Sequence, residues 1–557
     1  MKIYFPRTKK AFNKAAIGLG VVGILGFSAY KTDDRLFEIA KNLDVFATMY
    51  KELNALYVDE INPTKAMRVG IQAMLKELDP YTVFYPEDEI EDYFTMNVGA
   101  YNGIGATIEY FEGKHIVAML YEDSPADKAG IKIGDQIVKI NNVDVTDKTD
   151  AEFGRLLKGQ TGTSVKLALE RIGQSKPLQI SVGRDVIKTP NVPHYGMIND
   201  EVGYIQLTDF SRTAAKEIKT ATLELKDKGM KNLVLDLRGN PGGLLNMAVE
   251  ICNFYLPKNL LVVETKGKVK EWNYKYQTKE QPLDTDMPIV VLINGRSASA
   301  SEIVSGTLQD YDRAVLIGQR SFGKGLVQIT KDLSYNTKIK VTTSKYYIPS
   351  GRCIQAIDYG HRQADGSFGK LPDSLRVPFK TKGGRLVLDG AGIDPDLTTN
   401  SSQQSDFTKD LVKHKMIFNF ANKYYFDHQT EKPKENFTLD NKTSTEFDTW
   451  LKSQKYNYQT ADQKGIDALI KSSKESGEYS KMRASLEELK RVADQNTQGL
   501  VKKNWDEIKE ALELEILSRY YYQKAMKFVS FEKDQDIQEA LKLFANPQKY
   551  KSILAGK

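Results

Sequence analysis

The feature that most constrains the fold is an alternation of short apolar runs and helical stretches between residues 195 and 400. The apolar runs are VGYIQL, NLVLDL, PIVVLIN and AVLIG, and their aliphatic composition is typical of buried strands. Helices are expected between these runs, at 214–228, 245–256 and 298–308. Strands that alternate with helices favour a largely parallel sheet that is buried beneath helices. We therefore expect an α/β domain here.

The sequence that precedes this domain has a different pattern. Residues 99–186 read as short alternating strands and turns, and VKLALE places Val165, Leu167 and Leu169 on one face of a strand. The stretches YNGIGATIEY and SPADKAGI, followed by GD and IN, resemble a PDZ domain of the bacterial type. This series predicts a small, β-rich binding domain.

The resemblance implies a binding loop within YNGIGATIEY. In PDZ domains, backbone N–H groups of this loop capture the C-terminal carboxylate of a peptide, and the peptide adds to the sheet as a strand. Glycines permit the tight, donor-exposing backbone that this capture needs. The peptide-binding residues are therefore expected to be Gly103, Ile104, Gly105 and Ala106.

Two loops that follow strands of the α/β domain are candidates for chemistry. In the first, NLVLDLRGNPGGLL, the residues Gly239, Gly242 and Gly243 make a turn that leads into a helix. Such a turn aims backbone N–H groups at one point, as an oxyanion requires. A plain strand-to-helix connection would look the same from this stretch alone.

The second loop is PIVVLINGRSASASEIV, in which a strand ends at Asn294 and a run of alternating serines begins a helix. A serine there lies near unpaired N–H groups and the positive end of the helix dipole, which stabilise negative charge on a substrate oxygen. Helix capping accounts for one such serine, but poorly for three alternating ones.

Taken in order, DLRGNPGG, SASASEI, LQD, FGKGLVQ and YYIPSGRCIQ resemble the carboxyl-terminal processing proteases, a family of serine–lysine peptidases. The resemblance covers roughly residues 35–400. It implies a mixed α/β peptidase core of the ClpP/crotonase-like kind, into which the PDZ domain is inserted.

The same resemblance assigns the site residues by motif position. The nucleophile falls on Ser299, the general base on Lys324, the residue that orients the base on Gln328, and a supporting role on Asp310. The oxyanion donors are then the N–H of Ala300 and one N–H from Gly242 or Gly243.

A lysine base needs a lowered pKa, because the ordinary value is about 10.4. Desolvation lowers it, and the glycines around Lys324 allow close packing against the amine. Gln328 would hold the amine without adding a negative charge. The five histidines of the chain match no nucleophile or metal motif, which fits a mechanism without histidine. No metal and no cofactor are expected.

The tetrapeptide SFGK occurs twice, at 321–324 and 367–370, with the Ser-x-x-Lys spacing of penicillin-binding enzymes. That signature requires a helix, so that both side chains share one face, whereas the glycines of the first copy predict a loop. The second copy lies in ADGSFGKLPD, which reads as a turn. We expect neither Ser321 nor Ser367 to be a nucleophile. A cell-wall acyltransferase that uses one of them is an alternative.

The N-terminus carries five basic residues followed by an uncharged apolar run, AAIGLGVVGILGFSAY, at 15–30. This pattern is typical of a signal peptide or an N-terminal anchor, although a spanning helix usually needs about 20 residues. We favour an uncleaved anchor with its basic flank in the cytoplasm. The expected location is the bacterial cell envelope, on the periplasmic side of the inner membrane, anchored or secreted.

At 557 residues the chain is too long to fold around a single hydrophobic core, so several domains are expected. The net charge of +6 is small and is not gathered into a basic stripe, which disfavours nucleic acid as a partner. The expected parts are a signal or anchor at 1–31, a helical domain at 32–95, a PDZ domain at 96–188, a peptidase domain at 189–400 and a C-terminal helical domain at 401–557. The last could bind a partner, dimerise or simply stabilise the chain.

The predicted function is cleavage of extended or unfolded polypeptides at or near their free C-termini, which the PDZ domain docks. The main alternative is a membrane-anchored PDZ scaffold with an inert protease domain. The intact set of Ser299, Lys324 and Gln328 favours the enzyme. The expected partners are polypeptide substrates and the membrane, and a homo-oligomer or an activating adaptor is left open.

Overall fold

A computed structural model describes residues 34–90, 99–363, 367–399, 404–429, 432–434, 437–496, 499–528 and 531–557. The apolar segment expected to be a signal or anchor lies outside these residues. None of the helices within the described ranges is long and apolar enough to cross a membrane. The chain divides into two compact units, Met1–Glu77 and Leu78–Lys557.

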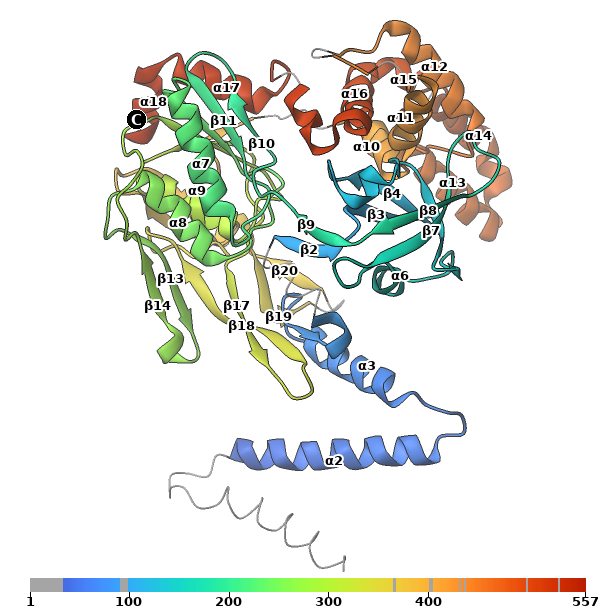
Figure 1. Ribbon diagram of the computed structural model, residues 1–557, viewed down its shortest axis with the longest axis horizontal. Coiled ribbons are helices and arrows are strands. Elements are labelled where there is room, and N and C mark those ends of the chain that lie inside the picture. The colour runs from blue at the N-terminus through green and yellow to red at the C-terminus, as the bar shows by residue number, and fades with distance from the viewer. Residues whose placement is uncertain are drawn as a thin grey trace, which may run out of the picture. The chain divides into compact units, whose positions relative to one another are not determined.

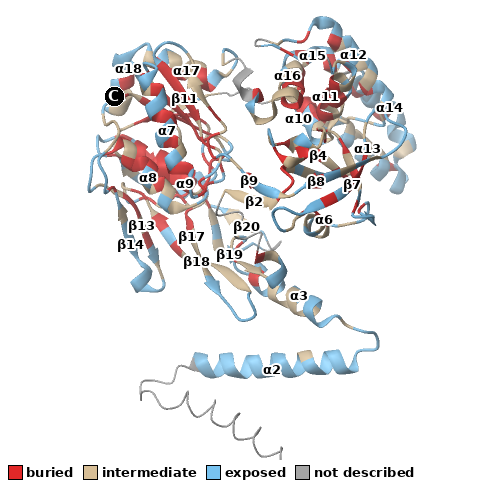
Figure 2. Cartoon of the chain, viewed as in Figure 1, coloured by how far each residue is buried: buried red, intermediate tan, exposed pale blue. Residues whose placement is uncertain are grey.

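The described part of the first unit consists of two helices, α2 (Asp34–Leu56) and α3 (Pro63–Lys76). Asn62 starts α3, because its side chain accepts a hydrogen bond from the N–H of Lys65 at 2.9 Å and Pro63 occupies the first turn. The apolar side chains of α2 are exposed along nearly its whole length (Figure 2).

The second unit contains the expected α/β domain (Figure 1). Its central sheet has the strand order β10-β11-β12-β15-β16-β23, in which only the β10–β11 pair is antiparallel. The four apolar runs form its middle strands, so the expectation of a largely parallel sheet is confirmed. The strands are β10 (His194–Met197), β11 (Val202–Gln206), β12 (Asn232–Asp236), β15 (Ile289–Ile293), β16 (Val315–Gly318) and β23 (Leu397–Thr398).

Helices cover both faces of this sheet. One face packs against α7 (Ala214–Asp227), α8 (Leu245–Tyr255) and α9 (Ala300–Asp310), close to the three expected helices. The opposite face packs against α17 (Gln535–Phe544) and α18 (Pro547–Leu554), the last two described helices of the chain, and both contact β16 (Figure 1). Both helices lie in the range that the sequence analysis assigned to the C-terminal helical domain, and they pack against the central sheet.

A second sheet of the peptidase domain carries residues of the site. Its order is β1-β18-β13-β14, and β17 also pairs with β18. The strands are β1 (Val83–Tyr85), β13 (Leu261–Gly267), β14 (Tyr274–Gln277), β17 (Leu326–Asp332) and β18 (Lys338–Tyr347). Two hairpins, β19 (Ile357–Arg362) with β20 (Phe368–Lys370) and β21 (Pro378–Lys380) with β22 (Leu386–Leu388), and the short 3-10 helices Glu87–Glu89, Lys270–Trp272 and Asp373–Leu375 complete the domain.

The predicted PDZ domain is a separate sheet with the order β3-β4-β5-β7-β8, and β6 pairs with β5. The chain enters it through β2 (Ala100–Gly103) and leaves through β9 (Asp185–Lys188), which pair antiparallel. The other elements are β3 (Ala106–Phe111), β4 (Lys114–Leu120), α5 (Pro125–Lys128), β5 (Gln136–Ile140), β6 (Val143–Asp144), α6 (Asp150–Leu157), β7 (Ser164–Glu170) and β8 (Leu178–Gly183). VKLALE forms β7, as predicted.

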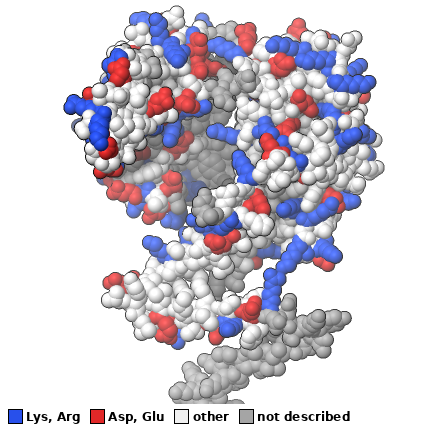
Figure 3. Space-filling model, turned by 180° about the vertical axis from the view of Figure 1, so that it is seen from behind, with Lys and Arg blue, Asp and Glu red and all other residues white. Residues whose placement is uncertain are grey.

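The region after residue 401 is helical, as its amphipathic pattern predicted. Its helices are α10 (Asp406–Lys413), α11 (Met416–Asp427), α12 (Asn441–Ser453), α13 (Ala461–Glu475), α14 (Tyr479–Asn496), α15 (Leu500–Lys503) and α16 (Trp505–Tyr521), followed by the 3-10 helix Tyr522–Phe528. Phe447, Trp505 and Ile508 belong to its own apolar core. On the face drawn in Figure 3, basic and acidic side chains are interspersed.

Candidate active site

Ser299 lies at the junction between β15 and α9. The turn NGRSA leaves the end of β15, and α9 begins at the next residue, Ala300. Ser299 has φ 55° and ψ −112°, a backbone conformation that L-residues rarely adopt and that is found at functional sites. The strained backbone presents the serine at the N-terminal end of α9, as the alternating serines predicted.

Two backbone amides next to Ser299 can receive an oxyanion. The N–H of Ala300 and the N–H of Gly243 have no acceptor among the residues that the structure describes. The N–H of Gly242, by contrast, donates to Asn240 Oδ1 at 2.8 Å. Of the two glycines that the sequence left open, Gly243 therefore has the available donor.

Gly242 has a different part in the site. A Cβ on this residue would lie 2.6 Å from the carbonyl O of Ala298 and 2.8 Å from the N of Ala300, and φ is +98°. Only glycine allows the RGNPGG loop to lie so close to the start of α9. The glycine turn and the serine loop are thereby held against each other.

A buried carboxylate, Glu302, links the backbones of Ser299 and Lys324. Its side chain accepts hydrogen bonds from the N–H of Ser299 at 2.7 Å and the N–H of Lys324 at 2.9 Å. It also accepts from the N–H of Gly323 at 2.7 Å and the hydroxyl of Ser321 at 2.5 Å. Burial raises the pKa of Glu302 to about 7, although these four bonds favour the charged form.

A second buried group bridges the same two residues. The Tyr346 hydroxyl lies 3.2 Å from the carbonyl O of Ser299 and 2.7 Å from the carbonyl O of Lys324. The backbones of Ser299 and Lys324 are thus fixed relative to each other from two sides, by Glu302 and by Tyr346.

The Lys324 side chain is partly buried. The pKa of Lys324 is lowered to about 8, first because burial penalises the charged amine and then because Lys340 is nearby, while Glu302 and Asp79 oppose the shift. Its Nζ lies 4.1 Å from the centroid of the Tyr81 ring. The structure describes both Ser299 and Lys324, and no hydrogen bond joins the hydroxyl of one to the amine of the other.

Gln328 lies on β17, and its amide takes part in another contact. Its Nε2 donates to Thr342 Oγ1 at 3.2 Å, and that hydroxyl donates to Asp79 Oδ1 at 3.1 Å. The glutamine therefore belongs to a polar chain that ends near the lysine rather than on it, and its orienting role stays a prediction.

Asp310 lies at the opposite end of α9, about 15 Å from its first residue at 1.5 Å per residue. Its carboxylate pairs with Arg352 at 2.9 Å and accepts from the N–H of Ser350 at 2.9 Å. Arg352 is fully buried, so the pair holds the loop after β18 on the helix. This arrangement suits the supporting role that the motif implied.

The two SFGK copies lie in different surroundings. The first copy is a loop, as expected, and Ser321 is buried with its hydroxyl donating to Glu302 and accepting from the N–H of Ile393 at 2.6 Å. The second copy was read as a turn. That reading is wrong for 368–370, which form β20 and pair with β19 in an exposed hairpin.

In the PDZ domain, the GIGA loop precedes an edge strand. Within the described chain, β3 pairs on one side only, with β4. Gly105 has φ +82°, and a Cβ there would lie 2.2 Å from the Cβ of Ser124. The carbonyl groups of Ile104 and Gly105 accept bonds from the N–H of Ala126 at 2.8 Å and of Tyr121 at 3.0 Å. The loop is therefore rigid and leads into an unpaired strand edge.

Comparison with known sequences identifies the family. The model of peptidase family S41 matches residues 201–360, that of a PDZ domain matches 116–171, and that of a C-terminal helical domain of probable PDZ-proteases matches 407–544. The carboxy-terminal-processing protease of Bartonella bacilliformis is 35% identical over 57% of this chain and 73% of its own length. The carboxy-terminal processing protease CtpA of Bacillus subtilis is 33% identical over 68% and 79%.

This chain belongs to the carboxy-terminal processing proteases. It is a serine peptidase with a PDZ domain, an S41 peptidase core and a C-terminal helical domain, as the motif series implied. Among solved structures, the photosystem II D1 C-terminal processing protease aligns over 64% of this chain and 86% of its own, at 24% identity and a TM-score of 0.37.

Three residues of this protease escaped the sequence analysis. Glu302 and Tyr346 bridge Ser299 and Lys324. Asn240 holds the glycine turn, because its main-chain carbonyl accepts from the N–H of Ala298 at 3.0 Å and its side chain accepts from the N–H of Gly242 at 2.8 Å. An acid three residues after a helix-starting serine is a recognisable capping signal. Its burial beneath a loop some 20 residues later has no signal in the local pattern.

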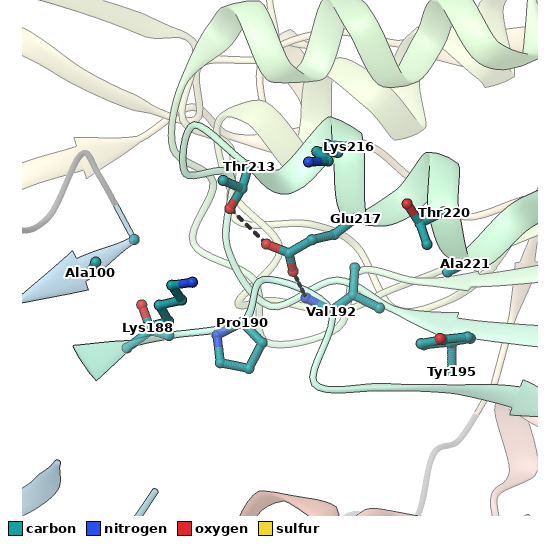
Figure 4. A pocket seen from close by; sticks show the side chains of 12 residues that line it. Ala100, Lys188, Pro190, Val192, Tyr195, Thr213, Lys216, Glu217, Thr220 and Ala221 are labelled. Atoms are coloured by element: carbon teal, nitrogen blue, oxygen red, sulfur yellow. Dashed lines mark hydrogen bonds between the residues drawn. The ribbon is translucent and has the colours of Figure 1, made fainter. Parts of the chain in front are cut away.

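Another cavity, of about 520 Å³, is lined by residues of α7, of β2, β9 and β10, and of the segment between β9 and β10 (Figure 4). The carboxylate of Glu217, which lines the cavity, is hydrogen-bonded to neighbouring residues of the protein. It accepts from the hydroxyl of Thr213 at 2.7 Å and from the N–H of Val192 at 2.9 Å. None of the predicted site residues lines this cavity.

Proposed function

We propose that this protease is an endopeptidase that cleaves extended polypeptides at or near free C-termini, with Ser299 as nucleophile and Lys324 as general base. The observation that carries the proposal is the double bridge of Glu302 and Tyr346 between the backbones of these residues. The two bridges fix the backbone of Lys324 relative to the backbone of Ser299. The pKa of this lysine is about 8, and the serine has a strained backbone conformation.

The chemistry follows from what each group can do. Neutral Lys324 takes the proton of the Ser299 hydroxyl as Oγ attacks the substrate carbonyl carbon. The N–H groups of Ala300 and Gly243 donate to the oxyanion, and each such donor contributes about 3–4 kcal/mol. The Lys324 ammonium then gives its proton to the leaving amine. Water, deprotonated by the same lysine, hydrolyses the acyl-enzyme.

The lysine reaches the serine by a change of side-chain rotamer. The backbone of Lys324 is held, so the amine moves from the face of the Tyr81 ring toward Ser299 while the main chain stays in place. A cation above an aromatic ring is stabilised by about 0.5–2 kcal/mol. The neutral amine loses most of that attraction and is the form free to act as a base.

The PDZ domain docks the substrate in this proposal. The unpaired edge of β3 supports strand addition, and the GIGA loop offers backbone donors at the end of that strand. We further propose that residues 15–30 anchor the chain or direct it to the cell envelope, so that the protease acts on the periplasmic side.

Two measurements test the function. We expect cleavage of an unfolded protein to fall by about 10²–10⁴ in Ser299→Ala and Lys324→Ala, and to be unchanged in Ser367→Ala, whose serine lies in the exposed hairpin. Equal activity of Ser299→Ala and the parent would show that Ser299 is not the nucleophile.

The second measurement uses a substrate whose C-terminus is amidated. Amidation should weaken cleavage by raising KM, and undiminished cleavage would show that the C-terminal carboxylate is not docked.

A further inference from the structure

The start of α17 is bound to the loop that carries one of the proposed oxyanion donors. That loop, RGNPGG, begins at Arg238, two residues after the last residue of β12. Asp534 starts α17, because its side chain accepts hydrogen bonds from the N–H groups of Asp536 and Ile537 at 3.0 and 3.2 Å. Although Arg238 and Asp534 are 296 residues apart in the sequence, their side chains are in direct contact.

The guanidinium of Arg238 is bound by three carboxylates at once. Asp534 accepts two parallel bonds, from Nη1 at 3.0 Å and from Nη2 at 2.8 Å, in the bidentate geometry that fixes orientation as well as distance. Asp536 accepts from Nη1 at 2.8 Å, and Asp236 accepts from Nη2 at 2.6 Å and from Nε at 3.0 Å. Two of the three carboxylates that orient this arginine therefore come from the end of the chain.

Two of these carboxylates are buried and have further partners. The side chains of Asp236 and Asp536 are each only 2% exposed. The hydroxyl of Tyr204 donates to Asp236 at 2.7 Å, and the hydroxyl of Thr399 donates to Asp536. A buried ion cluster is tolerated only while its partners stay in place. The cluster therefore resists displacement of the arginine.

The residues that follow this arginine contact the serine loop directly. Gly239 donates its N–H to Asn294 Oδ1 at 3.0 Å. The main-chain carbonyl of Asn240 accepts from the N–H of Ala298 at 3.0 Å. Gly243, whose N–H is a proposed oxyanion donor, lies three residues beyond Asn240. A shift at the start of the RGNPGG loop would thus move both the donor and the serine loop.

We propose that Asp534 and Asp536 are positioning residues of this peptidase: they hold Arg238, and through it the RGNPGG loop, in the conformation that presents the N–H of Gly243 to the oxyanion. The inference rests on the proposed oxyanion site. It adds that a segment from the far end of the chain sets the geometry of that site, so that the start of α17 contributes to turnover and not only to folding.

An asparagine at position 534 separates orientation from folding. Asp534→Asn keeps a side-chain oxygen for the start of α17, since Asn and Asp are equally good N-cap residues. The amide group has only one oxygen, so it cannot accept from Nη1 and Nη2 together, and the bidentate pair with Arg238 is lost. Because three carboxylates share one cation, the loss of one negative charge also relieves repulsion among them. We therefore expect little change in stability.

The test uses the full chain with the single substitutions Asp534→Asn and Asp536→Asn. For each variant, kcat and KM are measured on an unfolded protein substrate at a temperature well below its Tm. Glu539→Gln is the matched control, because Glu539 is a carboxylate of the same helix that pairs with Lys549 at 3.4 Å and not with Arg238. Ser299→Ala is measured in the same assay, so that the proposed nucleophile is tested separately.

We expect kcat to fall about tenfold in Asp534→Asn and in Asp536→Asn, which is the scale of one lost charge-assisted hydrogen bond. KM and Tm should stay close to the values of the parent, and Glu539→Gln should match the parent throughout. A merely structural role would instead lower Tm and leave the kcat of the folded enzyme unchanged.

Two results would overturn the inference. One is a kcat within twofold of the parent in both folded aspartate variants, and the other is a loss of kcat that follows a fall in Tm. In either case an inactive Ser299→Ala would leave the proposed function standing. If Ser299→Ala is as active as the parent, the proposed function fails, and the inference fails with it.

Discussion

Gly242→Ala tests the geometry of the oxyanion site most severely. The added Cβ would lie 2.6 Å from the carbonyl O of Ala298, and 2.8 Å from both the N of Ala300 and the Cβ of Ser299. Two of these atoms belong to the backbone, so they can move only if the start of α9 moves. The substitution therefore displaces the N–H of Ala300 and the proposed nucleophile, Ser299, together.

The expected loss follows from two sources. An L-residue in left-handed backbone costs about 1–2 kcal/mol, which appears as lower stability. Misplacing one oxyanion donor lowers kcat about 10²–10³-fold. Gly239→Ala is the matched control, because Gly239 lies in the same loop at φ +75° with no atom within 4 Å of the added Cβ. The Gly239→Ala variant therefore has the backbone strain of a left-handed L-residue but no steric contact with the start of α9.

The assay compares kcat, KM and the unfolding temperature of the two variants with the parent. We expect both to lose a few degrees of Tm, and only Gly242→Ala to lose kcat by two orders of magnitude or more. A folded Gly242→Ala variant that keeps a kcat within threefold of Gly239→Ala would refute the close packing of the glycine turn on the serine loop.

Three further predictions concern the base, the bridge and the chain end. Because Lys324, as the proposed base, must be neutral to act and its pKa is about 8, kcat/KM should rise with pH through about 8 and then level off; a profile that is flat from pH 6 to 9 would contradict this. Tyr346→Phe removes the one hydroxyl that the carbonyl groups of Ser299 and Lys324 share as a donor, so kcat should fall about tenfold at unchanged KM, and a change in KM alone would speak against positioning. A chain that ends at residue 530 uncovers one face of the central sheet, and should give little soluble protein; a soluble truncation with the parent's Tm would show that α17 and α18 are dispensable.

The sequence predicted the parts of the fold whose signals are local. Runs such as NLVLDL and PIVVLIN are strands because their apolar residues are buried on both faces of a parallel sheet, and this appears in the residues themselves. The PDZ domain was predictable because its glycines and its SPADKAGI series are a short, ordered pattern. Amphipathic periodicity likewise predicted helices at the chain end.

The sequence could not predict contacts between distant segments. The periodicity of the sequence predicts an apolar face on α17. The strands on which this face packs lie more than 200 residues upstream, and the local sequence does not indicate which strands they are. The same holds for Gln328, whose amide meets Thr342 across the β17–β18 pair and, through it, Asp79. The choice between Gly242 and Gly243 depended on where the side chain of Asn240 points, which only the folded loop decides.

The central claim is that Ser299 is a nucleophile activated by Lys324. Its most direct test is labelling of the full chain with a fluorophosphonate probe, followed by peptide mapping of the modified serine in the parent and in Lys324→Ala. The account predicts a single label on Ser299 in the parent, with a rate at least 100-fold lower in Lys324→Ala. A label on Ser321 or Ser367, or one on Ser299 that forms equally fast without the lysine, would contradict it.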